Sequence, residues 1–389
     1  MKKFLKIIII SVLIIITSSG CWDNMDINDR AFTSAIALDK GKDGQIDVTL
    51  QILRPNIIKA NQEGGTSESS IWTSTTQGET IFEAIRDQLK IIHRKPFYTH
   101  LRLIMIGEEL AKEGIKDVLD FFLRDHEVRI TPKIIVTKGL KAKDVINADS
   151  KLMNIPALHL EGILENNIAE AKTVEVNLID VVHELTAAHG ASVIATIIAP
   201  NKEKLENIQD FKIEGSAVLI KDKLIGYLNI LQTRGYLFIK DEVDGGIIVT
   251  DNPKEKDKKV SIEIIRASGN MDVNIEGEDL ILSVEVEIKG ALAEQQGSAD
   301  LANEEMLNEL ESAVEKEIEG NIKNVLEVAQ KTYKSDFFGF GNKIYGKYPY
   351  YWDEIKGNWN EEFSKLPIEI SIKAKLERTG TISQPMTIQ

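Results

Sequence analysis

The sequence predicts an α+β protein with mixed or antiparallel sheets flanked by helices, divided into more than one domain. Three observations lead to this prediction. Strand and helix patterns follow one another irregularly in the first half, rather than as repeated βαβ units. Strongly alternating strands dominate the second half, and one long amphipathic helix precedes the last of them. With 389 residues, 43% of them hydrophobic, the chain is long enough for two or three domains.

The first half is predicted to open with a hairpin formed by residues 31–38 and 46–52, which flank a turn rich in Lys, Gly and Asp. Thr80 and Glu83 have capping-box spacing, so a helix is expected over 79–92. Its apolar residues at helical spacing are Phe82, Ile85, Leu89 and Ile92. The later elements predicted here are strands at 101–106, 128–136 and 193–198, a helix at 110–122, two helical pieces within 141–170, and a helix at 174–189. Pro132 inside one of these strands favours an edge position or a bulge.

The charged segment 201–210 is predicted to separate this region from a second unit. The strands expected in the second unit are 213–220, 224–228, 262–264, 271–275, 280–288 and 368–376, with a short helix at 231–238. The alternating strands are polar on one face, so we expect a largely antiparallel sheet with one covered side. The cover is a long helix with its apolar stripe at Leu307, Leu310, Val314, Ile318, Ile322, Val325, Ala329 and Tyr333.

Residues 1–20 have the layout of a secretory signal, with a basic start, an apolar middle and small residues at the end. The apolar block 7–16 is shorter than the roughly 20 residues that a membrane-spanning helix needs. Cys21 follows directly, as in a bacterial lipobox, although Ser18 stands where that pattern usually has leucine. We therefore expect cleavage before Cys21 and its acylation with long chains such as palmitate, which would anchor the protein outside the cytoplasmic membrane. The alternative is an ordinary cleavage site beside this cysteine.

Composition narrows the classes of function. The formal charge is −14, and residues 1–20 contain three lysines and no acid, so the processed chain would carry −17. Such a surface suits neither nucleic acid nor unaided adhesion to anionic lipid. Cys21 is the only cysteine, so the sequence predicts no disulfide and no cysteine-based metal site or nucleophile.

No motif predicts catalysis, a cofactor or a metal site. His183 and His189, the two histidines closest in sequence, lie six residues apart and do not have the spacing of a helical zinc site. There is no phosphate-binding glycine loop and no nucleophile elbow, and the G-F-G at 339–341 is better explained as a helix break. Adjacent carboxylates are expected by chance in so acidic a chain. We therefore expect a protein that is not an enzyme.

The segment 337–359 is unusually aromatic for a chain with 6% aromatic residues. Short helices packed against the sheet would bury these side chains in the core. The alternative is an exposed aromatic patch that binds a protein partner.

Several segments together resemble the Ger(x)C family, the C-subunit lipoproteins of spore germinant receptors. They follow one another in order over nearly the whole chain after residue 19. The segments are G-C-W-D at 20–23 with Ile27 to Asp29, G-E-T-I-F-E-A at 78–84, H-L-R-L-I-M-I-G-E-E-L-A at 100–111, D-F-F-L-R-D at 120–125, T-R-G at 233–235, D-F-F-G-F-G at 336–341, W-D-E-I-K-x-x-W at 352–359 and R-T-G at 378–380.

The resemblance implies a non-enzymatic, lipid-anchored subunit on the outer face of the spore inner membrane of an endospore-forming bacterium. It would assemble with A- and B-type membrane subunits and act in nutrient-triggered germination. The three domains described for the family imply that the N-terminal region 22–205 divides near Lys138, into 22–137 and 138–205, ahead of a C-terminal domain at 211–389. Direct nutrient binding is not expected, because no polar cluster for a small zwitterion is evident. A solute-binding lipoprotein, with two doubly wound lobes, is the alternative; a lipid-anchored cell-wall hydrolase is disfavoured for want of a metal or nucleophile motif.

Overall fold

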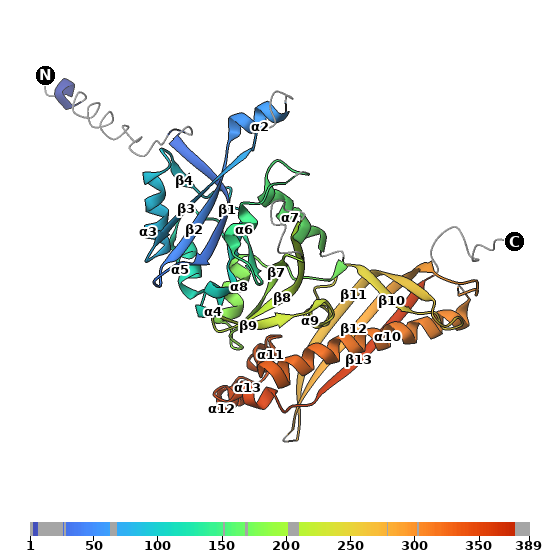
Figure 1. Cartoon of the computed structure of the whole chain (residues 1–389). Coiled ribbons are helices and arrows are strands. Elements are labelled where there is room, and N and C mark those ends of the chain that lie inside the picture. The colour runs from blue at the N-terminus through green and yellow to red at the C-terminus, as the bar shows by residue number, and fades with distance from the viewer. Residues whose placement is uncertain are drawn as a thin grey trace.

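The computed structural model describes residues 3–6, 26, 29–62, 68–150, 152–167, 170–200, 210–277, 279–301 and 303–377. They form two sheets with helices packed on both, arranged side by side along the molecule (Figure 1). No helix in these ranges is both long and apolar enough to cross a bilayer.

The first sheet is mixed, with the strand order β3-β2-β1-β5-β6-β7-β8-β9 and with β4 paired to the start of β1. Its strands are β1 (Arg30–Lys40), β2 (Ile46–Leu53), β3 (Ile71–Gly78), β4 (Lys95–Phe97), β5 (Leu103–Ile106), β6 (Lys133–Thr137), β7 (Ala191–Ile198), β8 (Lys212–Ile220) and β9 (Lys223–Leu228). The four central strands β1, β5, β6 and β7 are parallel, whereas the hairpin strands on either side are antiparallel.

Helices cover both faces of this sheet. They are α3 (Ile81–Asp87), α4 (Glu108–Glu113), α5 (Lys116–Arg124), α6 (Ala142–Ile146), α7 (Pro156–Asn167), α8 (Leu178–Thr186) and α9 (Ile230–Lys240). A further helix, α2 (Pro55–Gln62), follows β2 and belongs to neither core. Because side chains alternate along a strand, Ile36 and Leu38 of β1 face a core closed by α3, α4, α5 and α8. Ala35 and Ala37 face the opposite core, which α6, α7 and α9 cover and which continues into the second sheet.

The second sheet has the order β10-β11-β12-β13. The C-terminal elements are β10 (Gly246–Asp251), β11 (Lys259–Glu276), β12 (Asp279–Gln295), α10 (Glu304–Glu327), α11 (Phe340–Lys347), α12 (Pro349–Ile355), α13 (Trp359–Phe363) and β13 (Ile368–Glu377). Helix α10 lies across the sheet (Figure 1), and its predicted apolar stripe is buried or half-buried there. This confirms the predicted helix-on-sheet packing.

The edge strand β13 is held by both its neighbours. It runs parallel to β12 over its full length. On its other side, Glu315 and Glu311 of α10 accept hydrogen bonds from the backbone N–H groups of Ala374 and Leu376, each at 2.9 Å. These carboxylates accept hydrogen bonds from backbone N–H groups that an edge strand would otherwise leave unpaired.

Some expectations were wrong in detail. The hairpin 213–228, expected to open the second unit, instead extends the first sheet beside β7. Strands expected at 262–264 and 271–275 form the single strand β11. The pairing of β12 with β13 is parallel, so the second sheet is mixed. Strand β6 is central and not an edge strand. Pro132 lies just before it, at a position where a missing N–H does not interrupt the pairing of the strand.

Predicted helices also differ in length. The helix expected over 174–189 is confined to α8, which begins at the capping residue Asn177. The pieces expected within 141–170 are α6, which ends at Ile146, and α7, which begins at Pro156. In the first sheet, helical crossovers join β5 to β6 and β6 to β7, so its centre resembles βαβ units more than the sequence suggested.

Candidate functional site

The residue predicted to carry a lipid, Cys21, lies outside the described residues. Its acylation is therefore still a prediction. Within the described ranges, no group of three or more His, Cys, Asp or Glu side chains is arranged to hold a metal ion. His183 lies on α8, and His189 lies beyond its end, so one helix does not carry both.

The aromatic segment 337–359 contributes mainly to the core. Phe337, Phe338 and Phe340 are fully buried, and Trp352 and Trp359 are nearly so. Their rings pack edge-on or tilted, with Trp352 and Trp359 centroids 5.7 Å apart. Tyr345 and Tyr350 are exposed. The core interpretation thus holds for most of the segment.

A buried carboxylate organises this segment. Asp336, with no exposed surface, accepts hydrogen bonds from the backbone N–H groups of Phe338, Gly339 and Gly341 at 3.2, 2.9 and 2.7 Å. Gly339 has φ 97° and is the N-cap of α11, so the G-F-G is a helix start that needs a left-handed residue. The D-F-F-G-F-G segment therefore has a structural explanation.

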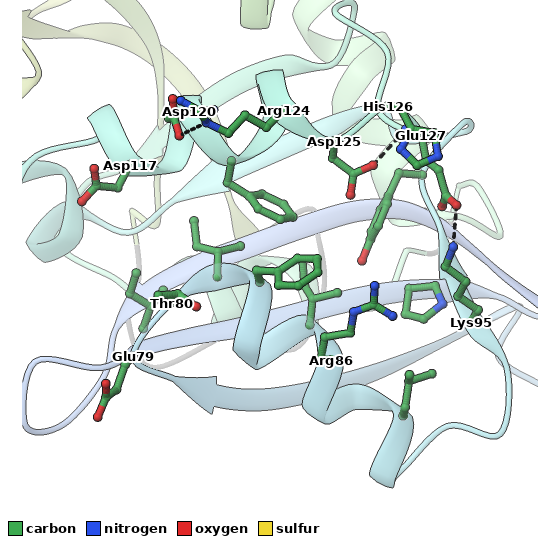
Figure 2. A pocket seen from close by; sticks show the side chains of 18 residues that line it. Glu79, Thr80, Arg86, Lys95, Asp117, Asp120, Arg124, Asp125, His126 and Glu127 are labelled. Atoms are coloured by element: carbon green, nitrogen blue, oxygen red, sulfur yellow. Dashed lines mark hydrogen bonds and ion pairs between the residues drawn. The ribbon is translucent and has the colours of Figure 1, made fainter.

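A surface groove lies between α3 and α5 (Figure 2). Its volume is about 630 Å³, within the roughly 300–1,000 Å³ typical of ligand pockets. Figure 2 shows Glu79, Thr80 and Arg86 on the α3 wall and Asp117, Asp120 and Arg124 on the α5 wall. Lys95, Pro96, Tyr98 and residues 125–127 also line it.

Local sequence fixes the α3 wall. The Thr80 hydroxyl accepts a hydrogen bond from the N–H of Glu83 at 3.1 Å and so caps the helix. The carboxylate of Glu83 accepts a hydrogen bond from the N–H of Glu79 rather than from that of Thr80. The second hydrogen bond of the predicted capping box is therefore made to the residue before the N-cap. The helix therefore begins at Ile81, and α3 ends at Asp87 with a 3₁₀ turn after it.

The apolar face of α3 is not the one expected. Ile81, Ala84 and Ile85 point into the core, whereas Phe82 is 52% exposed and Leu89 44% exposed. Phe82 faces Phe121 of α5, with ring centroids 6.4 Å apart. Two large apolar side chains thus remain open to solvent in this groove, a placement that often marks a binding surface.

The charged side chains at the rim of the groove are only partly paired with one another. Asp120 pairs with Arg124 at 2.6 Å, and Glu127 pairs with Lys95 at 2.7 Å. The remaining lining carboxylates, Glu79, Asp117 and Asp125, have no ion pair within the described residues, and neither has Arg86. The guanidinium of Arg86 lies 4.8 Å from the centroid of the Phe82 ring.

Tyr98 lies beneath this rim with an unsatisfied hydroxyl. The residue is 3% exposed, and its hydroxyl has no hydrogen-bond partner among the described residues. Burial, together with the negative charges of Asp125 and Glu127, raises the pKa of this phenol well above its ordinary value. A neutral hydroxyl without a hydrogen-bond partner is costly to bury.

Two segments quoted for the family resemblance meet at this groove. G-E-T-I-F-E-A supplies Glu79 to Phe82, and D-F-F-L-R-D supplies Asp120, Phe121, Arg124 and Asp125. The sequence argument missed the groove because these segments are about forty residues apart and neither contains a known ligand-binding motif. Chemically, the groove has neither a paired nucleophile and base nor a metal site; it offers apolar contact with charges around it.

Comparisons with known proteins agree with one another. Residues 23–200 match the family model described as the N-terminal domain of spore germination protein, and residues 214–380 match the one described as spore germination B3/GerAC like, C-terminal. The chain is 28% identical to spore germination protein KC of Bacillus subtilis (strain 168), covering 98% of this chain and 97% of that protein. It is 26% identical to spore germination protein B3 of the same organism, covering 94% and 95%.

A crystal structure of the GerBC protein has the same fold. The TM-score is 0.53 at 22% identity, covering 88% of this chain and 96% of that one. The two family matches divide between residues 200 and 214, within the charged segment predicted as a boundary, although β8 and β9 beyond it belong to the first sheet.

Proposed function

The chain belongs to the Ger(x)C family of spore germination proteins, and from this membership we propose that it is a lipid-anchored, non-enzymatic subunit of a spore germinant receptor. The observation that carries the proposal is the coverage: two family matches follow one another from residue 23 to residue 380. In this proposal the chain assembles with A- and B-type membrane subunits and is needed for germination triggered by nutrients.

The anchor in this proposal is the acylated Cys21, on the outer face of the spore inner membrane. Several long chains on one cysteine would give stable attachment, since each buried methylene contributes about 0.8 kcal/mol. The strongly acidic chain would not otherwise adhere to an anionic bilayer. The protein would act by contacts that differ between the resting and triggered receptor, because only differential contacts can shift such an equilibrium.

The alternative of a solute-binding lipoprotein has less support. That class is built from two doubly wound lobes, and here the second sheet has antiparallel β10, β11 and β12 with a single parallel strand, β13, at its edge. The relatives are also named as spore germination proteins.

The test is germination of spores that carry Cys21→Ala, scored nutrient by nutrient, with Ser19→Ala as the matched control. We expect Cys21→Ala protein to leave the membrane fraction and the response to one set of nutrients to be lost, while external dipicolinate still triggers germination. The Ser19→Ala spores should behave as wild type. If deletion of the whole gene, in a strain without other receptors of the same specificity, leaves every nutrient response intact, the proposed function is wrong.

A further inference from the structure

One end of the groove between α3 and α5, at Lys95, lies near the start of β1, and the other end, at Ile46, lies near the end of β1. Strand β4 pairs in register with the start of β1, with Lys95 opposite Arg30, and Lys95 also lines the groove. Cys21 precedes Arg30 by nine residues, which can span at most about 32 Å. A lipid on Cys21 would therefore keep this end of the first sheet close to the membrane surface.

The apolar floor of the groove is suited to a protruding side chain of a partner. Phe82 and Leu89 are about half exposed, and Phe121 is half-buried between them and the core. Aromatic side chains that remain open in the free protein are typical of residues that dominate the affinity of an interface. Tyr98 lies at the base, with its hydroxyl buried and without a hydrogen-bond partner among the described residues.

The charges around this floor favour a basic occupant. The lining holds five carboxylates against Arg86, Lys95 and Arg124. Lys95 and Arg124 are already paired, which leaves Arg86 and the carboxylates of Glu79, Asp117 and Asp125 without an ion pair among the described lining residues. One oxygen of Asp125 accepts a hydrogen bond from the N–H of Glu127 at 2.8 Å. A segment with lysine or arginine beside its apolar anchor would complement this pattern.

We propose that this groove is the docking site for a segment of a membrane-embedded receptor subunit, a segment with an exposed apolar side chain flanked by basic residues. The inference rests on the proposed function, because the anchor places the Lys95 end of the groove near the bilayer. Two segments of the family resemblance, far apart in sequence, line this groove.

The direct test is photocrosslinking in intact spores that contain the full-length chain. A photoreactive benzoylphenylalanine replaces Phe82 in one strain and Leu123 in the control strain. Leu123 lies on α5 and is 45% exposed, like the groove leucine Leu89, but it does not line the groove. We expect position 82, and not position 123, to crosslink to a membrane-spanning receptor subunit, at a peptide containing an apolar residue next to Lys or Arg.

Matched substitutions give a second readout. Phe82→Glu should lower recovery of the membrane subunit with this chain roughly tenfold or more, as for an anchor residue of an interface, whereas Leu123→Glu should leave it unchanged. Recovery should also fall between about 0.1 M and about 1 M salt, because the screening length falls from about 10 Å to about 3 Å. Thermal unfolding of both variants checks that the fold is retained, and Phe82→Leu should partly restore recovery.

The inference is overturned if positions 82 and 123 crosslink alike, or if position 82 reaches only phospholipid or a second copy of this chain. It is also overturned if position 82 is protected by a nutrient and crosslinks to no protein, which would indicate a small-molecule site. If gene deletion abolishes germination but Phe82→Glu spores germinate and retain the subunit as wild type does, this inference fails while the proposed function stands. If deletion has no effect, the proposed function fails first.

Discussion

The carboxylate of Asp336 accepts a hydrogen bond from the indole N–H of Trp359 at 3.0 Å, and it thereby joins the loop before α11 to the start of α13. The same carboxylate accepts three backbone N–H groups of the loop. One buried side chain thus fixes both the left-handed turn at Gly339 and the packing of an indole that is 3% exposed. The segments that contain Asp336 and Trp359 thus meet in one core.

Asp336→Ala should destabilise the protein strongly, because it leaves several buried N–H donors without an acceptor. Each unsatisfied group costs about 1–3 kcal/mol, so a loss of about 3 kcal/mol or more in the free energy of unfolding is expected. Urea unfolding of the purified protein measures it. The control is Asp353→Ala, whose exposed carboxylate pairs only with Lys356; a change beyond about 0.5 kcal/mol there would contradict the argument.

Gly235→Ala and Gly320→Ala should act in opposite directions. A Cβ at Gly235 of α9 would lie 2.3 Å from the backbone oxygen of Asn321 in α10, so the two helices would have to separate. A Cβ at Gly320 of α10 would meet nothing within 4 Å. We expect a lower melting temperature for the first and a gain of about 0.5–1 kcal/mol for the second, since alanine favours helix interiors. Equal effects would show that α9 and α10 do not pack this closely.

Tyr98→Phe and Tyr333→Phe test the unpaired hydroxyl of the groove. The Tyr333 hydroxyl donates to the backbone oxygen of Tyr227 at 2.9 Å, so its removal should cost about 1 kcal/mol. The hydroxyl of Tyr98 has no described partner, so its removal should leave stability unchanged or raise it. Differential scanning calorimetry of the purified protein without its partner decides; a loss at Tyr98 as large as that at Tyr333 would mean that its hydroxyl is already bound.

Asp39 should make stability depend on pH. Burial raises the pKa of this carboxyl, against the lowering effect of hydrogen bonds from the N–H groups of Lys143 and Ala142, and the net direction is upward from 3.8. The folded state therefore binds this proton more tightly than the unfolded state does. The contribution of Asp39 should rise as pH falls through its folded pKa and level off below 3.8.

The comparison with Asp39→Asn isolates this contribution. The difference in free energy of unfolding between wild type and variant should shift in favour of wild type as pH falls, and it should be constant at higher pH, where the carboxyl is ionised in both states. Denaturant unfolding at a series of pH values measures the difference. A shift of opposite sign would mean that the two backbone hydrogen bonds outweigh burial.

Sequence patterns predicted the helices and strands of this fold better than they predicted which strands pair with one another. Alternation in residues 280–288 correctly predicted a strand with one covered face, because burial selects every second side chain. The same kind of pattern in 213–228 could not reveal that β8 pairs with β7, since alternation identifies the buried face and not the neighbouring strand. Residues 267–269 of β11 interrupt the alternation without ending the strand, where Gly269 approaches the backbone of Phe238.

The groove between α3 and α5 could not be predicted from the sequence for a related reason. Phe82 occurs at helical spacing with Ile85 and was expected to be buried with it, but the helix starts at Ile81 and buries that residue instead. Ile85 is buried, whereas Phe82 lies one residue, or about 100° around the helix, from Ile81 and falls outside the buried face. Tyr98, Phe121 and Arg86 come together only through tertiary packing of α3, α5 and β4.

The last strand also determines when the fold can be completed. Strand β13 is the end of the described chain, and the residues it pairs with in β12 are made before α10 and three further helices. During synthesis, the edge of β12 that pairs with β13 therefore stays unpaired until residues 368–377 have been made. A chain truncated before residue 368 would leave that edge open and also lack the amides that Glu311 and Glu315 accept, and such open edges promote aggregation through intermolecular strand pairing. Residues 368–377 thus cover an edge of β12 that would otherwise be open.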